Sequence, residues 1–241
     1  MAGRPAPVVR PRSAPDRPDR FETGPYKDSD QGRIVVVAAG LALLLILWTL
    51  VGIGALRGLD GPVHAWTLRH RPPGSGTVIK WLLAGEMGLL AAVLAWLLRG
   101  HVGLLVRLGA LVIGAEGVVW VLKHAGRGWD VPWYANNFPS GHTTVGALLC
   151  LVLARALARL PVSGPVGRLR GLCFALAGQF GLLAVFPMGH VPSEMVGGFV
   201  LAITAAQIGG GWIAVALPPL QPVAVDGTER LLHTGEGRPP Y

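Results

Sequence analysis

The stretches Phe138-Pro-Ser-Gly-His-Thr-Thr144 and Gly189-His-Val-Pro-Ser-Glu194 each place a histidine directly in front of a long apolar run. Two apolar runs, 143–160 and 172–186, lie between His142 and His190. If the chain crosses a membrane in each of these runs, both histidines return to the same face. The two motifs therefore predict a bundle of membrane helices with a histidine pair at one end.

The composition supports a membrane protein. The 241 residues are 51% hydrophobic and only 14% charged, and the mean hydropathy is +0.51. Soluble domains carry about 25% charged residues, so a soluble globular protein is excluded. The 35 glycines favour close packing between transmembrane helices, because small residues let two backbones approach.

Six apolar runs predict an all-α fold, a polytopic bundle of six transmembrane helices. The runs are 34–56, 78–98, 104–122, 143–160, 172–186 and 191–217. Residues 1–33 are rich in Pro, Arg and Asp and lack apolar periodicity, so we expect a disordered cytoplasmic tail. Residues 218–241 predict a second such tail, which leaves 34–217 as the membrane domain.

Basic residues predict the orientation. If the termini are cytoplasmic, 15 of the 21 Lys and Arg residues lie on the cytoplasmic side, as the positive-inside rule requires. The histidine motifs then face outward. The Ala-, Gly-, Arg- and Pro-rich composition suggests a bacterial cytoplasmic membrane. The net charge of +8 is spread between apolar runs rather than gathered in one patch, which argues against nucleic acid as a partner.

The first motif combines a helix start with a histidine. Ser140 is a good N-cap, and Gly141 lets a ligand approach the backbone. The free amides at a helix N-terminus attract anions, and His142 in that turn can donate a proton to a leaving group. The alternative is an ordinary helix cap with an interfacial histidine.

The second motif pairs a histidine with a carboxylate. Glu194 lies four residues after His190, within reach of its ring, so it can accept the Nδ1 proton and leave Nε2 free to attack phosphorus. A contact that only secures a loop is the alternative. Lys123 and Arg127 are also four residues apart and can clamp phosphate oxygens, or else anchor a helix at the headgroup layer.

The order of these pieces resembles the type-two phosphatidic acid phosphatase superfamily, whose relatives include lipid phosphate phosphatases and vanadium haloperoxidases. The resemblance covers residues 34–217, and Pro-Ser-Gly-His is its most specific part. The stretch Leu59-Asp-Gly-Pro-Val-His-Ala-Trp66 is similar to the first outer loop of bacterial members, and Gly197-Gly198 fits the glycine that follows the third motif.

The resemblance implies a helical bundle with a phosphate pocket at its outer face and no metal or other cofactor. His190 would be the nucleophile and Glu194 its orienting acid, while His142 would protonate the leaving group. The positions that hold phosphate oxygens would be Lys123, Ser140 and Gly141, and the spacing from Lys123 adds Arg127 as a further phosphate-binding candidate.

Three departures from the family pattern stand out. The Arg-Pro of the first motif falls on Asp130 and Val131, and the Ser-Arg of the third motif falls on Leu183 and Ala184. The final Asp is Glu194, which is still a carboxylate. Because phosphoryl transfer depends on cations around the phosphate oxygens, the lost arginines matter more than the Glu. Arg127 partly replaces the first of them.

The leading hypothesis is an integral membrane phosphatase acting on a lipid phosphate or polyprenyl diphosphate, with membrane lipids as its partners. The alternatives are a catalytically impaired relative that binds anionic lipid, a transferase that passes the phosphoryl group to another acceptor, and a transporter. The transporter rests only on Glu86 and Glu116 inside apolar runs. We expect these acids to pair with each other or with Lys80, or to bond to neighbouring helices. Cys150 and Cys173, also inside apolar runs, are expected to be small buried hydrophobes.

Overall fold

The computed structural model describes residues 24–126, 137–159 and 166–217. These residues form seven α-helices and no strand. In chain order the helices are α1 (Gly24–Gly52), α2 (Arg57–His70), α3 (Ser75–Leu97), α4 (Val102–Ala125), α5 (Gly141–Leu157), α6 (Val166–Val185) and α7 (Pro192–Ala216). The prediction of an all-α fold is confirmed for this part of the chain.

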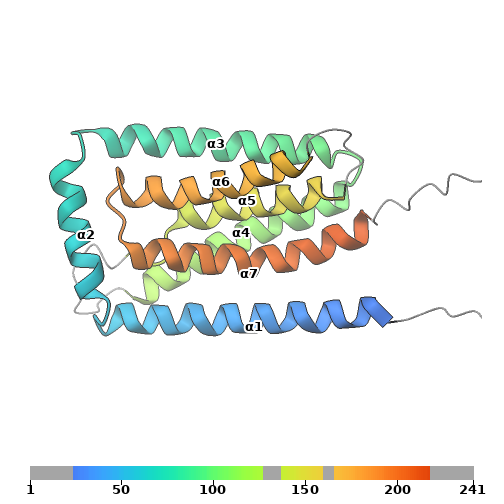
Figure 1. The fold of residues 1–241 in the computed structure, drawn as a ribbon, viewed down its shortest axis with the longest axis horizontal. Coiled ribbons are helices and arrows are strands. Elements are labelled where there is room, and N and C mark those ends of the chain that lie inside the picture. The colour runs from blue at the N-terminus through green and yellow to red at the C-terminus, as the bar shows by residue number, and fades with distance from the viewer. Residues whose placement is uncertain (1–23, 127–136, 160–165, 218–241) are drawn as a thin grey trace, which may run out of the picture.

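Six of the helices run lengthwise along one bundle, and α2 crosses one end of it (Figure 1). Helix α1 lies along α7, and α3 lies on the opposite side of the bundle (Figure 1). The described part of α1 begins, and α7 ends, at the end of the bundle away from α2 (Figure 1). The helices that follow the two histidine motifs, α5 and α7, both start at the end that α2 covers.

Five helices are long and apolar enough to cross a membrane: Asp30–Gly52, Ser75–Leu97, Val102–Ala125, Gly167–Val185 and Pro192–Ala216. This is the pattern of a multi-pass membrane protein. Helix α5, which the sequence assigned to a sixth crossing, is also apolar but has only 17 residues. Its length falls short of the roughly 20 residues that a span normally needs.

Helix α5 occupies the centre of the bundle, where it packs against α3, α4, α6 and α7. Thirteen of its 17 residues are buried, as expected for a helix that is apolar on all sides and enclosed by others. The Phe180 ring lies directly on Gly146, where a side chain would collide with it. Cys150 on α5 and Cys173 on α6 are both buried free thiols, which confirms their predicted role.

Helix α2 replaces the outer loop that the sequence predicted between the first two spans. Three of its polar residues, Asp60, His64 and Thr67, are buried at intervals of four and three residues. Its exposed side carries the apolar Trp66 and Leu68 together with Arg69 and His70. This mixture of apolar and basic residues suits a helix at a membrane interface that covers a polar interior.

The first helix starts earlier in the sequence than the predicted first span. Helix α1 begins at Gly24 rather than near residue 34, and Asp30 and Arg33 form an ion pair one turn apart within it. Residues 24–33, which the sequence assigned to a tail, are therefore helical. The remaining parts of both predicted tails, 1–23 and 218–241, lie outside the described residues.

Two glycines bring α7 close to the segment that starts α5. A Cβ on Gly198 would lie 2.9 Å from Ser140 O and 2.9 Å from Thr143 Cβ. A Cβ on Gly197 would overlap the Phe138 ring. Only residues without a side chain fit here, so Gly197-Gly198 sets the distance between the two histidine-bearing helix starts.

We therefore expect Gly198→Ala to lower the thermal unfolding temperature of the purified protein in detergent, because overpacking costs about 1–3 kcal/mol. The matched control is Gly85→Ala on α3, where no atom lies within 4 Å of the added methyl group. This control should unfold at or above the wild-type temperature. Equal unfolding temperatures for the two variants would contradict the proposed close contact.

Candidate active site

The first histidine follows directly from the cap of α5. The Ser140 Oγ accepts the Thr143 amide at 3.4 Å, so Ser140 is the N-cap, as predicted. Thr143 Oγ1 also donates to Ser140 Oγ at 3.1 Å, and Thr144 Oγ1 donates to Ser140 O at 2.8 Å. Within the described residues, the amides of Gly141 and His142 have no acceptor. They are the groups that an anion at this helix start would meet.

The second histidine is held by the first turn of α7. The His190 Nδ1 lies 2.5 Å from Glu194 Oε2, and the Val191 amide donates to the same oxygen at 3.4 Å. Glu194 is fully buried. Because Nδ1 carries the proton toward the carboxylate, Nε2 keeps the lone pair that a nucleophile needs. The predicted His190–Glu194 pair is therefore present.

A backbone hydrogen bond joins the two motifs. The Ser140 amide donates to Glu194 O at 3.0 Å. Near this bond, the centroids of the His142 and His190 rings lie 6.4 Å apart, and the ring planes are tilted at 57°. Both histidines are half-buried. Since a hydrogen bond spans about 2.8 Å, one tetrahedral group between the rings can contact both of them.

Helix α2 secures the loop that carries His190. The Asp60 carboxylate is buried and accepts both the Ser193 amide at 3.1 Å and the Ser193 hydroxyl at 2.6 Å. A carboxylate at a helix N-terminus is favoured by the helix dipole. His64 Nδ1 lies 3.1 Å from Gly189 O. The sequence interpretation quoted this stretch but missed these contacts, although the four-residue spacing of Asp60 and His64 was a usable signal.

Cations approach the histidine pair from three segments. Lys80 on α3 and Lys123 on α4 both act electrostatically on His142, and Lys123 also acts on Glu194 and Glu116. The Arg71 guanidinium lies beside Gly189, where a Cβ would be 3.1 Å from Nη1. From the sequence, Lys123 was predicted to bind phosphate, Lys80 was a possible partner of Glu86 or Glu116, and Arg71 served only as an orientation signal.

The structure describes one of the positions at which the resembled pattern has an arginine. Asp130 and Val131, and the candidate replacement Arg127, lie outside the described residues. Ala184 is fully buried at the end of α6, and its carbonyl accepts the His190 amide at 3.2 Å. This position thus contacts the backbone of His190 but carries no charge.

The two intramembrane acids are not paired with each other in the described contacts. Glu86 on α3 accepts from Gln179 Nε2 on α6 at 3.2 Å, which confirms a bond to a neighbouring helix. Glu116 lies against the start of α5, since a Cβ on Gly141 would be 3.0 Å from its Oε1. Its carboxyl group therefore lies beside the first residue of α5.

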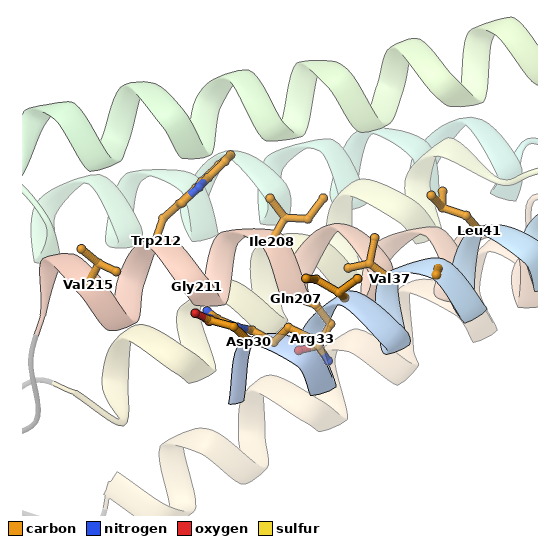
Figure 2. Close-up of a pocket in the computed structure, with 11 residues that line it drawn as sticks. Asp30, Arg33, Val37, Leu41, Gln207, Ile208, Gly211, Trp212 and Val215 are labelled. Carbon is orange, nitrogen blue, oxygen red and sulfur yellow. The ribbon is translucent and has the colours of Figure 1, made fainter. Parts of the chain in front are cut away.

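One cavity of the bundle lies at the end away from the histidines, and another extends close to His142. A groove of about 680 Å³ between α1 and α7 is lined by Arg33, Gln207 and Trp212 (Figure 2), at the end of the bundle away from α2. A second, apolar cleft of about 550 Å³ is lined by α3, α4 and α5, and it reaches Val145. Val145 lies three residues after His142, on the same side of α5.

Comparisons with family models, curated proteins and solved structures found no match to this chain. Among the described residues, no group of three His, Cys, Asp or Glu side chains is placed to hold a metal ion.

Removing the Asp60 carboxylate should loosen the start of α7. We expect Asp60→Ala to destabilise the protein by about 1–3 kcal/mol, because Ser193 loses both hydrogen bonds in a buried position. Hydrogen exchange of the peptide that contains 190–195 should become faster. Ser193→Ala removes only the hydroxyl bond and should have a smaller effect.

A double-mutant cycle provides the control for this prediction. Because the two side chains interact directly, the combined Asp60→Ala and Ser193→Ala variant should lose less stability than the sum of the single variants. Additive losses would show that Asp60 does not act through Ser193.

Proposed function

We propose that the protein is an integral membrane phosphatase that removes phosphate from a lipid phosphate or a polyprenyl diphosphate through a phosphohistidine at His190. We further propose that α5 also crosses the membrane, which brings the number of crossings to six. The site would then face the outer side of a bacterial cytoplasmic membrane, with both termini in the cytoplasm. One observation carries the proposal. The His190–Glu194 pair, with Nδ1 and Oε2 2.5 Å apart, lies beside His142, whose ring centroid is 6.4 Å from that of His190.

In the first step, His190 Nε2 attacks phosphorus and a nitrogen–phosphorus bond forms. The bond between phosphorus and the lipid oxygen breaks, and that oxygen takes a proton from His142, which holds one once the bound phosphate places its negative charge beside the ring. Glu194 stabilises the positive charge that develops on the His190 ring, because its carboxylate accepts from Nδ1. The lipid alcohol, or a lipid monophosphate from a diphosphate substrate, then leaves.

In the second step, water attacks the phosphohistidine. His142, now neutral, takes a proton from the water while the new oxygen–phosphorus bond forms. The nitrogen–phosphorus bond breaks, inorganic phosphate leaves, and both histidines return to their starting states. All proton transfers in this scheme use side chains of the chain itself.

The charge on the phosphate oxygens needs cations on several sides. Lys123 and Lys80 supply them near His142, and Arg71 supplies one near Gly189. The amides of Gly141 and His142 add donors at the start of α5. Arg71 thus stands where it can compensate for Ala184, the position at which the family pattern has an arginine.

The apolar cleft supports a lipid substrate. Met87 and Ala91 of α3, Leu108 and Val112 of α4, and Val145 of α5 are among the side chains that line it. Because Val145 shares a face of α5 with His142, a hydrocarbon chain in this cleft would lead toward the histidine pair. In this proposal, one lipid molecule has its phosphate at the histidines and its hydrocarbon tail in the cleft.

The second candidate is a protein that binds an anionic lipid without hydrolysing it. Glu116 favours this function, because its carboxylate stands beside Gly141 and repels a phosphate dianion there. The intact His190–Glu194 pair favours catalysis instead, since lipid binding alone does not require an oriented imidazole. Phosphate release separates the two candidates.

The first test is phosphate release from lipid phosphates and diphosphates by purified protein in detergent, with a metal chelator present. We expect release by the wild type and none by His190→Ala, because the nucleophile is lost. Glu194→Gln should reduce kcat by about 10³–10⁴-fold, as for other oriented histidines that lose their carboxylate. Radiolabelled phosphate from the substrate should be trapped on His190 as an acid-labile adduct.

The control is His70→Ala, which removes an exposed histidine that contacts Trp66 outside the pair. It should leave release unchanged. Absence of release from well-folded wild-type protein across the panel would reject the phosphatase and favour lipid binding. Release that persists in His190→Ala would reject the phosphohistidine.

A second test concerns Arg71. We expect Arg71→Ala to lower kcat/KM by about 100–1000-fold, because loss of one preorganised donor to a transition-state oxygen costs about 2.7–4 kcal/mol. Arg71→Lys should retain part of the activity, and added guanidinium should partly rescue Arg71→Ala. The matched control is Arg69→Ala, because Arg69 donates to Ala65 O within α2. Equal activity of the Arg71 and Arg69 variants would show that Arg71 does not contact the phosphate.

A further inference from the structure

A basic cavity lies at the end of the bundle opposite the histidine pair. It has a volume of about 350 Å³ and is lined by Arg155 and Arg159 near the end of α5, Arg170 near the start of α6, and Gly210 on α7. The apolar Phe174 completes one wall. None of the residues that line it is acidic, and the sequence has no Asp or Glu between Asp130 and Glu194.

One of the three arginines is built into the bundle. Arg155 donates from Nη1 to Ala206 O at 2.6 Å and from Nη2 to Gln207 Oε1 at 2.8 Å. Its side chain lies flat on α7, where a Cβ on Gly210 would be 2.7 Å from the Arg155 Cδ. The glycine therefore makes room for a cation that helix packing alone would exclude.

The other two arginines have no countercharge within the described part of the chain. Arg159 and Arg170 make no ion pair with any described residue. An arginine does not lose its proton in proteins, so three permanent positive charges share one cavity. An anion that binds there reduces the repulsion among these charges. Guanidinium groups match phosphate oxygens, with which they form paired hydrogen bonds.

The neighbouring groove between α1 and α7 differs from the arginine cavity in its charge. In the groove between α1 and α7, Arg33 is already neutralised by Asp30 (Figure 2). That groove therefore offers an apolar surface without a free charge. The arginine cavity instead offers a free charge with an apolar wall.

We propose that this cavity binds the phosphate headgroup of an anionic phospholipid, with Arg159 and Arg170 holding the phosphate and Arg155 supporting them. The cavity lies at the end of apolar helices, where lipid headgroups are concentrated, and Phe174 offers a surface to the adjoining acyl chain. Basic pockets between transmembrane helices on the cytoplasmic side are a recurrent form of headgroup site. The basic-residue count predicts that this end faces the cytoplasm.

Lipid binding to the full-length protein in detergent can be measured by native mass spectrometry. The probes are phosphatidylglycerol, which is anionic, and phosphatidylcholine, which has no net charge. We expect the wild type to retain phosphatidylglycerol at least tenfold more tightly than phosphatidylcholine. The double variant Arg159→Gln and Arg170→Gln should lose this preference, whereas Arg159→Lys with Arg170→Lys should keep most of it.

The matched control is the double variant Arg99→Gln and Arg107→Gln. It removes two exposed cations near the same end of the bundle but outside the cavity. This control should bind phosphatidylglycerol like the wild type. If both glutamine variants lose binding equally, or neither loses it, the cavity is not the site. Arg170→Gln alone, on the exposed side of α6, tests the same point if the double variant does not fold.

Competition identifies the source of the phosphate. Glycerol 3-phosphate and inorganic phosphate at millimolar concentration should not displace the lipid, because they lack the acyl chains. Displacement by either one would overturn the lipid assignment in favour of a soluble phosphate compound. None of these readouts depends on phosphate release, so the outcome is independent of the proposed phosphatase activity.

Discussion

The candidate site depends on the hydrogen bond that the Ser140 amide donates to the Glu194 carbonyl. It links the start of α5 to the start of α7, and Gly198 allows the approach because it has no side chain to collide with Thr143. Each partner also serves its own helix, since Ser140 caps α5 and Glu194 holds His190. The same short contact therefore sets both the packing of the bundle and the distance between the two histidine rings.

Helix α2 closes the site from outside. It turns Asp60 and His64 inward and Trp66 outward, so the polar interior is covered by a helix whose exposed side is partly apolar. Asp60 is buried, and the free-energy cost of removing its carboxylate from water is offset by two hydrogen bonds and by the dipole of α7. This arrangement shields the histidine pair while leaving His142 and His190 half-buried. The site is thus positioned at the boundary between the bundle and its surroundings, where a headgroup can reach it.

Much of the site was predictable because its parts are local in sequence. The cap at Ser140 and the pair of His190 with Glu194 follow from spacings of three and four residues along one helix. The contributions of Arg71 and Lys80 were not predictable, because the turn between α2 and α3 meets the His190 loop only in the folded bundle. Gly189 and Arg71 are far apart in sequence and touch only there. The α2 helix was missed for a similar reason, since its buried residues are polar and give no apolar periodicity.

The sequence by itself determined the all-α membrane character, the buried cysteines and the two local histidine motifs. Each of these depends on hydropathy or on residues within one turn of each other, and those forces act in any folded arrangement of the chain. Only the tertiary structure decided that the two motifs meet, that α5 is enclosed by four helices, and that Asp60 bonds to Ser193 across 133 residues. Such contacts depend on how whole helices pack, and no spacing along the chain encodes them.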